Sequence, residues 1–116
     1  MRPEPRAFAE AWIAAWNARD LEAVLSHYAD DIVFVSPNST RYTGDPTGRV
    51  EGKAALRDYW AKALTAAGLS FTLRSVYAGP DSVAIRYFSS RTGAEAVEVA
   101  RFGADGLVHD SAAYYE

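Results

Sequence analysis

The sequence predicts an α+β domain in which three N-terminal helices pack on one face of a curved antiparallel sheet and enclose a cone. Two observations predict this class. Apolar residues in the first half of the chain recur with the 3.6-residue period of helices, and after Gly68 the period changes to the two residues of strands. Four strand-like segments then follow one another across short turns, which is the pattern of an antiparallel meander.

The composition indicates one globular domain over residues 1–116. It argues against nucleic acid and membranes as partners. Hydrophobic residues make up 49% of the chain and charged residues 23%, which is ordinary for a globular protein. The net charge is −3 and the basic residues are scattered, so no nucleic-acid partner is expected. Without cysteine there is no disulfide or thiolate metal site, and no apolar run reaches membrane-spanning length. We therefore expect a cytoplasmic protein without a membrane partner.

The chain is organised around its first helix, which is expected over residues 6–18. Phe8, Trp12 and Trp16 follow one another at four-residue intervals and therefore share one face of this helix. Aromatic residues make up 13% of the chain, more than a core of this size needs, which is typical of an aromatic-lined cavity or an interface. The tryptophans therefore either fill the core or line a pocket.

The other elements follow from the same periodicities. Asp20 is a suitable N-cap for a short second helix, and Asp30-Asp31 is interpreted as the corner between that helix and the first strand. A long loop with a short strand near residues 41–43 is expected before the third helix. The predicted helices cover residues 6–18, 21–29 and 53–67, and the predicted strands cover 32–35, 70–78, 82–90, 94–102 and 107–115.

Strict alternation along each strand predicts which side chains share a face. In the segment 70–78 it places Phe71 and Tyr77 on the same face. In the last strand it places His109 on the face of Ser111 and Tyr115. A slip of one residue in register reverses such assignments, because neighbouring side chains point to opposite faces.

Three stretches of the chain resemble a known superfamily. They are Trp12–Glu22, then Tyr28–Phe34 followed by Ser36-Pro37, and Gly48–Leu56. They are similar to the nuclear transport factor 2-like superfamily, in particular its SnoaL-like and ketosteroid-isomerase-like branches. The resemblance implies a cystatin-like α+β roll with a pocket inside the cone, and a homodimer formed through the outer face of the sheet. It does not identify a reaction, because this cone carries isomerases, cyclases, dehydratases and non-catalytic modules.

The same resemblance argues against steroid isomerisation. Ketosteroid isomerase uses an Asp base and an oxyanion hole made of a Tyr and a protonated Asp. By position in the resemblance, the base falls on Ser36, the oxyanion Tyr on Trp12 and its supporting Tyr on Trp60, while the protonated Asp falls on Glu98. A serine hydroxyl cannot take a carbon-bound proton unaided, and an indole N–H is far less acidic than a phenol. Of the original carboxyl groups, only the one at Glu98 remains.

Glu98 and His109 are the candidate catalytic residues. The expected strand face of Glu98 is otherwise formed by Ala96, Ala100 and Phe102, where burial would raise the carboxyl pKa and suit a general acid. The alternative is an exposed carboxylate beside an arginine. If strand pairing brings His109 near Glu98, the two form an acid/base couple. The alternative for His109 is a position at the rim or at an interface.

Three functions follow from these residues. The first is binding of a small apolar or aromatic molecule in a tryptophan-lined pocket, with weak acid/base chemistry. The second is an isomerase, cyclase or dehydratase that uses Glu98 with His109, and the third is a dimerisation module whose cone is plugged by its tryptophans. No cofactor is expected, and the two histidines lack the spacing of metal ligands. The expected pocket residues are Trp12, Trp16, Tyr28, Phe34, Ser36, Trp60, Ala100, Phe102 and Ser111.

Overall fold

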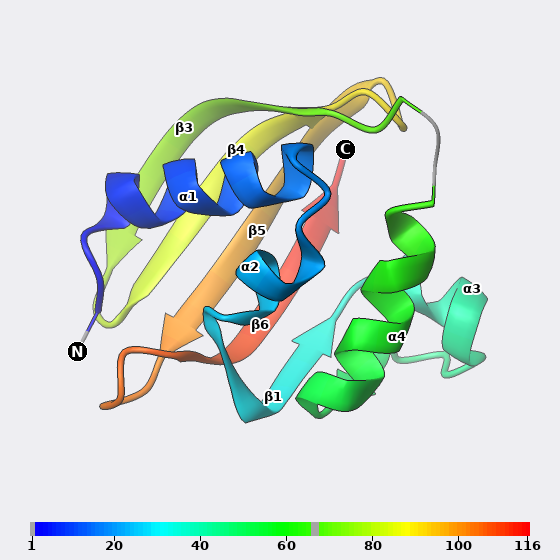
Figure 1. Cartoon of the computed structure of the whole chain (residues 1–116), viewed down its shortest axis with the longest axis horizontal. Helices are drawn as coiled ribbons and strands as arrows, with labels where there is room; N and C mark the ends of the chain where they lie inside the picture. Colours follow the sequence, from blue (N-terminus) through cyan, green and yellow to red (C-terminus); the bar gives the residue numbers. More distant parts are fainter. Residues whose placement is uncertain (1, 66–67) are drawn as a thin grey trace.

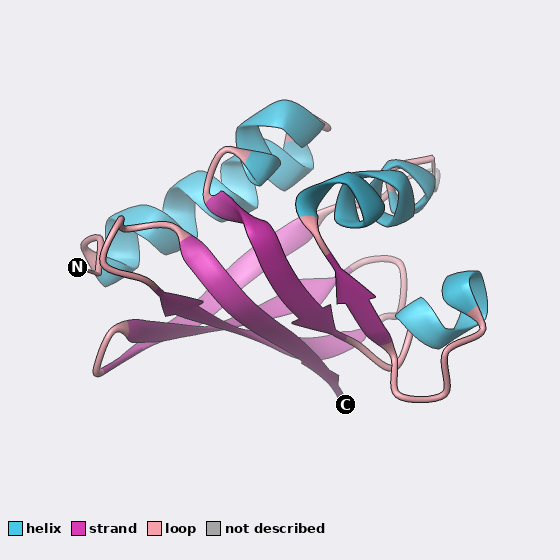
Figure 2. Ribbon diagram, turned by 90° about the horizontal axis from the view of Figure 1, so that it is seen from below, coloured by secondary structure: helices cyan, strands magenta, loops and turns pink. Residues whose placement is uncertain are grey.

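The computed structural model describes residues 2–65 and 68–116, and it confirms the predicted α+β class (Figure 1). A six-stranded curved sheet, which does not close, carries the two long helices on one side (Figure 2). No helix in these two ranges is long and apolar enough to cross a membrane. The helices are α1 (Pro5–Asn17), α2 (Leu21–Leu25), α3 (Ser39–Thr43) and α4 (Lys53–Ala63), and the strands are β1 (Tyr28–Val35), β2 (Arg49–Glu51), β3 (Phe71–Gly79), β4 (Ser82–Ser89), β5 (Ala94–Phe102) and β6 (Val108–Tyr115).

The sheet order is β2-β1-β6-β5-β4-β3, and most of its pairs are antiparallel. The predicted meander is confirmed, since β3, β4, β5 and β6 pair antiparallel in succession. One pair differs from the expectation of a wholly antiparallel sheet, because β1 runs parallel to β6, with Phe34 opposite Ser111. The first strand thereby joins the far end of the meander, and α1, α2 and α4 come to lie over its concave face (Figure 1).

Helix α1 begins and ends with side-chain hydrogen bonds. The Glu4 carboxylate accepts from the backbone N–H groups of Arg6 and Ala7, while Pro5 occupies the first turn, where a missing N–H does no harm. At the other end, the Asn17 side chain accepts from the N–H of Phe71 at 2.7 Å and donates to its carbonyl oxygen at 2.9 Å. The helix is therefore fixed to β3, with its aromatic face turned to the sheet.

Strand β1 starts four residues earlier than predicted. Helix α2 ends at Leu25, and the carbonyl oxygen of His27 already accepts the N–H of Val108 at 2.8 Å. Asp30 and Asp31 therefore lie inside the strand, and the prediction of a helix-to-strand corner there is wrong. The register between β1 and β6 shifts between Tyr28 and Val33, and both aspartates lie in this stretch. Their side chains are exposed.

The segment between β1 and α4 contains a helix rather than the short strand expected near residues 41–43. Helix α3 is capped at its C-terminal end by Gly44. This glycine adopts a left-handed conformation, and its N–H donates to the carbonyl oxygen of Thr40. Gly48 also has a positive φ, and a side chain there would collide with the carbonyl oxygen of Ser36. The next helix, α4, ends at Ala63, earlier than predicted; residues 66–67 of the prediction lie outside the described residues.

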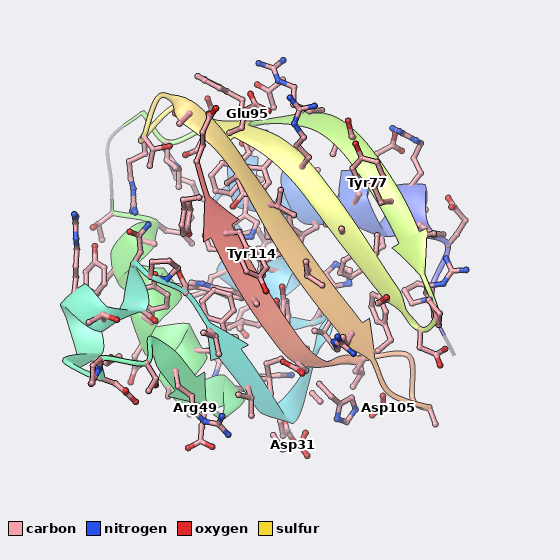
Figure 3. All side chains as sticks on the ribbon, turned by 180° about the vertical axis from the view of Figure 1, so that it is seen from behind. Asp31, Arg49, Tyr77, Glu95, Asp105 and Tyr114 are labelled. Carbon is pink, nitrogen blue, oxygen red and sulfur yellow. The ribbon has the colours of Figure 1, made fainter. Side chains whose placement is uncertain are left out.

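An extra residue in β3 overturns the predicted alternation. Leu73 pairs with Tyr87 and Ser75 pairs with Arg86, so Arg74 has no partner of its own in β4. This bulge reverses the faces beyond it, because two residues of one strand oppose one residue of the other. Tyr77 is consequently 58% exposed on the convex face, and the prediction that it shares the face of Phe71 is wrong (Figure 3).

Candidate functional site

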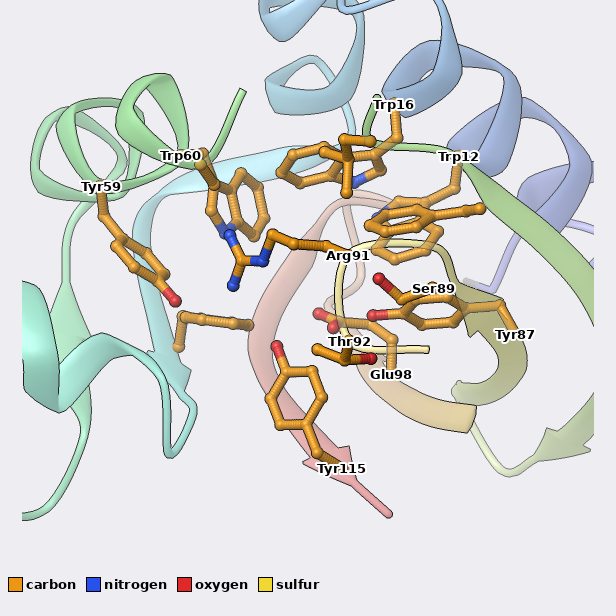
Figure 4. Close-up of a pocket in the computed structure, with 14 residues that line it drawn as sticks. Trp12, Trp16, Tyr59, Trp60, Tyr87, Ser89, Arg91, Thr92, Glu98 and Tyr115 are labelled. Atoms are coloured by element: carbon orange, nitrogen blue, oxygen red, sulfur yellow. The ribbon is translucent and has the colours of Figure 1, made fainter. Parts of the chain in front are cut away.

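A cavity lies between α1, α4 and the concave face of the sheet (Figure 4). Its volume is about 50 Å³, well below the ~300–1,000 Å³ of most ligand pockets. Aromatic rings form most of the wall, and its polar groups include hydroxyl groups, one carboxyl, one guanidinium and the indole N–H of Trp16. The lining residues are Trp12, Trp16, Phe34, Tyr59, Trp60, Ala63, Leu69, Phe71, Tyr87, Ser89, Arg91, Thr92, Glu98 and Tyr115.

Three tryptophans form the helical wall of this cavity. Trp12 and Trp16 come from α1 and Trp60 from α4, and each is at most 5% exposed. Their rings meet edge to face, with centroids 6.0 Å apart between Trp12 and Trp16 and 5.1 Å apart between Trp16 and Trp60. Phe71 of β3 stacks on Trp12 at 6.0 Å with an interplanar angle of 16°. The wall is therefore a set of interlocking aromatic faces and edges.

The indole nitrogens of the two α1 tryptophans are in different situations. Trp12 Nε1 donates to the hydroxyl oxygen of Tyr28 at 2.9 Å, so this donor is already used. Trp16 Nε1 is buried and has no hydrogen-bond partner among the described residues. Figure 4 shows it on the edge of the ring that is turned toward the cavity. A buried donor without a partner costs about 1–3 kcal/mol, so this position favours an acceptor.

Glu98 lies at the centre of the sheet wall. It is 3% exposed and lines the cavity. On β5 it is paired with Ile85 of β4 on one side and with Ala113 of β6 on the other. Burial raises its pKa to about 8, an effect that a 2.6 Å hydrogen bond from Ser111 Oγ to Glu98 Oε2 partly opposes. No cation in the described ranges pairs with it. At neutral pH the carboxyl is therefore mostly protonated and can donate a hydrogen bond.

Two further hydroxyl groups accompany Glu98. Figure 4 shows the Tyr87 and Ser89 hydroxyls of β4 on the same side of the cavity as the Glu98 carboxyl. Burial raises the pKa of Tyr87 well above its usual value, and the neighbouring charge of an ionised Glu98 raises it further. Tyr87 therefore stays neutral, and this wall presents hydrogen-bond donors to whatever enters the cavity.

His109 is not near Glu98 in the structure. Phe102 pairs with Val108 and Arg101 pairs with Asp110, so His109 is the extra residue of a bulge in β6. Its Nδ1 lies 3.2 Å from Asp31 and its Nε2 3.0 Å from Asp105, at the outer margin of the sheet. The expectation that His109 shares the face of Ser111 is wrong for this reason. The acid/base couple with Glu98 is not formed.

Among the expected pocket residues, the structure brings four to the cavity wall: Trp12, Trp16, Phe34 and Trp60. Five others are buried but do not line the cavity. Phe102 meets Phe8 of α1 edge to face with ring centroids 5.0 Å apart. Tyr28 accepts the Trp12 indole N–H, and Ser111 donates to the Glu98 carboxyl. The buried residues outside the wall are Tyr28, Ser36, Ala100, Phe102 and Ser111.

Several wall residues were not expected from the sequence. Tyr59 precedes Trp60 in α4, and Tyr87 and Ser89 continue the alternation of β4, so periodicity could have indicated them. Arg91 and Thr92 lie in the turn between β4 and β5, where periodicity gives no signal. No group of three or more residues that could hold a metal ion occurs in the part of the chain that is described.

Comparisons with known proteins agree with this architecture. The profile of the SnoaL-like domain matches residues 9–110, whereas no curated protein matches the chain. A SnoaL-like protein of unknown function from Burkholderia thailandensis is 42% identical, with 97% of this chain and 99% of that chain covered and a TM-score of 0.91. TerC, co-crystallised with polyporic acid, is 21% identical over 97% and 92% of the two chains, with a TM-score of 0.75. A proposed polyketide cyclase from Sinorhizobium meliloti is 16% identical over 93% and 94%, with a TM-score of 0.72.

Proposed function

The chain belongs to the SnoaL-like domain family, and we propose that it binds a small planar aromatic molecule in the tryptophan-lined cavity, with protonated Glu98 donating to an oxygen of that molecule. The observation that carries this proposal is Glu98 itself. A buried carboxyl with a raised pKa is unusual, and groups of this kind concentrate at functional sites. It lines an otherwise mainly aromatic cavity.

The aromatic wall supports a planar ligand. Offset and edge-to-face ring contacts contribute about 0.5–1.5 kcal/mol each beyond simple burial, and the edges of Trp16 and Trp60 are already arranged in this way. The N–H of Trp16, which has no partner among the described residues, provides a second donor in addition to the Glu98 carboxyl. A ligand with a carbonyl or phenol oxygen at its inner end therefore fits both the apolar and the polar parts of the wall.

Binding requires the cavity to expand from its present volume of about 50 Å³, because cavities of ~150 Å³ are those that accept benzene. Arg91 and Thr92 are the wall residues on an exposed turn. Neither side chain makes a hydrogen bond or an ion pair with any described residue, so rotation of these two side chains breaks no such contact. We expect the cavity to enlarge at this turn.

An acid-catalysed reaction is the second candidate function, and the raised pKa of Glu98 favours it. A protonated carboxyl can act as a general acid toward a carbonyl oxygen in an isomerase, cyclase or dehydratase, and one positioned acid gives about 10²–10⁴-fold acceleration. The fold neighbours named as a polyketide cyclase and as a protein crystallised with polyporic acid fit either candidate function. No second carboxylate is among the residues described as lining the cavity.

The third candidate function is a dimerisation module whose cone is plugged by its tryptophans, and the small volume of the cavity favours it.

Whichever of the three functions holds, we propose that the protein forms a homodimer through the convex face of the sheet. Tyr77 and Tyr114 are 58% and 59% exposed on that face (Figure 3). Sedimentation velocity of the purified protein tests the dimer, and a monomer at micromolar concentration would contradict it.

Tryptophan fluorescence with a matched pair of ligands tests the binding proposal. We expect 2-acetylnaphthalene to give saturable quenching and to bind about tenfold tighter than 2-ethylnaphthalene, because only the ketone accepts hydrogen bonds. The advantage of the ketone should decline as the pH rises through about 8, where Glu98 loses its proton. In Glu98→Gln the amide still donates, so the preference for the ketone should remain and its pH dependence should disappear. Absence of saturable binding by either compound would overturn the proposal.

A further inference from the structure

A second, open hollow adjoins the mouth of the aromatic cavity. Its volume is about 420 Å³, and it shares Arg91 and Thr92 with the cavity. Polar and positively charged side chains from α3, α4 and the β4–β5 turn surround it, in contrast to the aromatic wall further in. We call it the basic hollow; its residues are Asn38, Arg41, Tyr42, Lys62, Thr65, Arg91 and Thr92.

The three cations of the basic hollow have no acidic partner. Arg41, Lys62 and Arg91 form no ion pair with any described residue, and no carboxylate is among the residues that line the hollow. Arginines that have an acidic partner in the described structure include Arg57, which forms two hydrogen bonds with the Glu22 carboxylate. On a chain with a net charge of −3, three unpaired cations around one hollow form a local site for an anion.

Arg91 connects the hollow with the cavity. It lines both, and Figure 4 shows its side chain crossing the cavity with the guanidinium end turned toward Trp60. The positive charge of Arg91 also acts on the hydroxyls of Tyr59 and Tyr115, whose pKa values it lowers against the stronger effect of burial. Arg91, together with Thr92, therefore lies at the boundary between the aromatic cavity and the basic hollow.

We propose that the ligand of this protein is an aromatic acid whose ring occupies the cavity and whose carboxylate is bound by Arg91, with Arg41 and Lys62 completing the anion site. This inference rests on the proposed function and adds the charge of the ligand to it. A guanidinium binds a carboxylate with two parallel charge-assisted hydrogen bonds, which explains an arginine at the position nearest the cavity. A phosphate monoester shares the same recognition chemistry, and the experiment separates the two.

Fluorescence titration at low salt and neutral pH compares three probes with the same ring: 2-naphthoate, 2-naphthamide and 2-naphthyl phosphate. We expect naphthoate to bind about tenfold tighter than the neutral amide, because hydrogen bonds to charged groups are about twice as strong as neutral ones. In Arg91→Gln the ratio of the naphthoate affinity to the naphthamide affinity should fall to about twofold or less. Arg101→Gln is the matched control, since Arg101 is an exposed arginine without an ion pair in the described structure and lines neither space.

The outcomes separate the two proposals. Equal affinity for naphthoate and naphthamide overturns the anion site and leaves the aromatic cavity as proposed. An effect of Arg101→Gln as large as that of Arg91→Gln also overturns the anion site, because it shows a general effect of charge. If none of the three probes binds, both proposals fail. Tighter binding of naphthyl phosphate than of naphthoate supports the anion site and replaces the carboxylate by a phosphate monoester.

Discussion

Ser111 on β6 donates a hydrogen bond to Glu98 on β5, and this 2.6 Å contact joins the carboxyl of the cavity to its neighbouring strand. The two residues are diagonal neighbours, because Glu98 is paired with Ala113 and Ser111 with Ala100. No other hydrogen bond to the Glu98 carboxyl occurs among the described residues. Burial therefore sets the raised pKa of Glu98, and the hydrogen bond from this one hydroxyl group opposes it.

Ser111→Ala is expected to raise the pKa of Glu98 further above about 8. The hydroxyl stabilises the ionised carboxylate, so its removal leaves burial unopposed. NMR titration of the carboxyl carbon in ¹³C-labelled protein measures the change. Ser70→Ala is the control, because Ser70 is exposed and precedes β3, which is separated from the strand of Glu98 by β4. A pKa that instead moves toward 4.5 would show that burial is not the main cause of the shift.

The stability of the protein is expected to fall as the pH rises from about 4.5 to about 8. The folded protein keeps the Glu98 proton up to about pH 8, whereas an unfolded chain releases it near 4.5. The unfolded state therefore binds fewer protons in this window, and the free energy of unfolding decreases with pH. At ~1.4 kcal/mol per unit, the total loss is about 5 kcal/mol.

Glu98→Gln tests this dependence, because the amide does not titrate. Urea unfolding at several pH values should show a much shallower decline of stability in the variant, and its advantage over the natural sequence should be largest near pH 8. Glu95→Gln is the matched control, because Glu95 lies on the same strand but is only partly buried and pairs with Arg74 and Arg86 (Figure 3). An unchanged slope in Glu98→Gln would assign the dependence to other groups.

The pKa of His109 is expected to lie above the ordinary histidine value of 6.5, and the pKa of His27 is expected to lie below it. The hydrogen bond to Asp105 raises the pKa of His109, with Asp31 acting in the same direction, whereas burial lowers the pKa of His27. His109 therefore contributes stability below about pH 6.5, and this contribution is lost as the pH rises through its raised pKa. Proton NMR resolves both rings. In Asp105→Asn the His109 value should drop, with His27 unchanged as the internal control.

Tyr28→Phe is expected to lower the free energy of unfolding by about 1–3 kcal/mol. The substitution removes the acceptor of the Trp12 indole N–H and leaves that donor buried without a partner. Tyr77→Phe is the control, since Tyr77 is 58% exposed and its change should stay within about 0.5 kcal/mol. Equal effects of the two substitutions, measured by chemical denaturation, would mean that the buried hydrogen bond adds nothing.

Periodicity was sufficient to predict that α1, α2 and α4 are helices and that β3, β4, β5 and β6 follow one another as a meander. Four-residue spacing alone fixes the relative directions of Phe8, Trp12 and Trp16, since these directions depend only on the helix itself. Alternation likewise placed Glu98 with Ala96 and Ala100, all three of which are buried. Strand β5 has no bulge between these positions, so a period of two holds along it.

The predictions of strand faces are wrong where one extra residue in a strand interrupts the alternation of side chains. Bulges at Arg74 and His109 reverse the faces of β3 and β6, and no residue type announces them because their cause is the pairing of two distant strands. The early start of β1 has the same origin, since the parallel partner β6 lies at the other end of the chain. Arg91 reaches the cavity from a turn, and only the folded chain places that turn beside α4.

The bulge in β3 also determines what happens at the open side of the sheet. Strand β3 is an edge strand, and a long flat edge offers unpaired backbone groups to another molecule. Here the edge is bent at Arg74, whose charged side chain is held by Glu95 of β5. The opposite edge, β2, is only three residues long. Neither margin is a suitable template for a foreign strand, so the chain is protected from growing into sheet-like aggregates by its own irregularities.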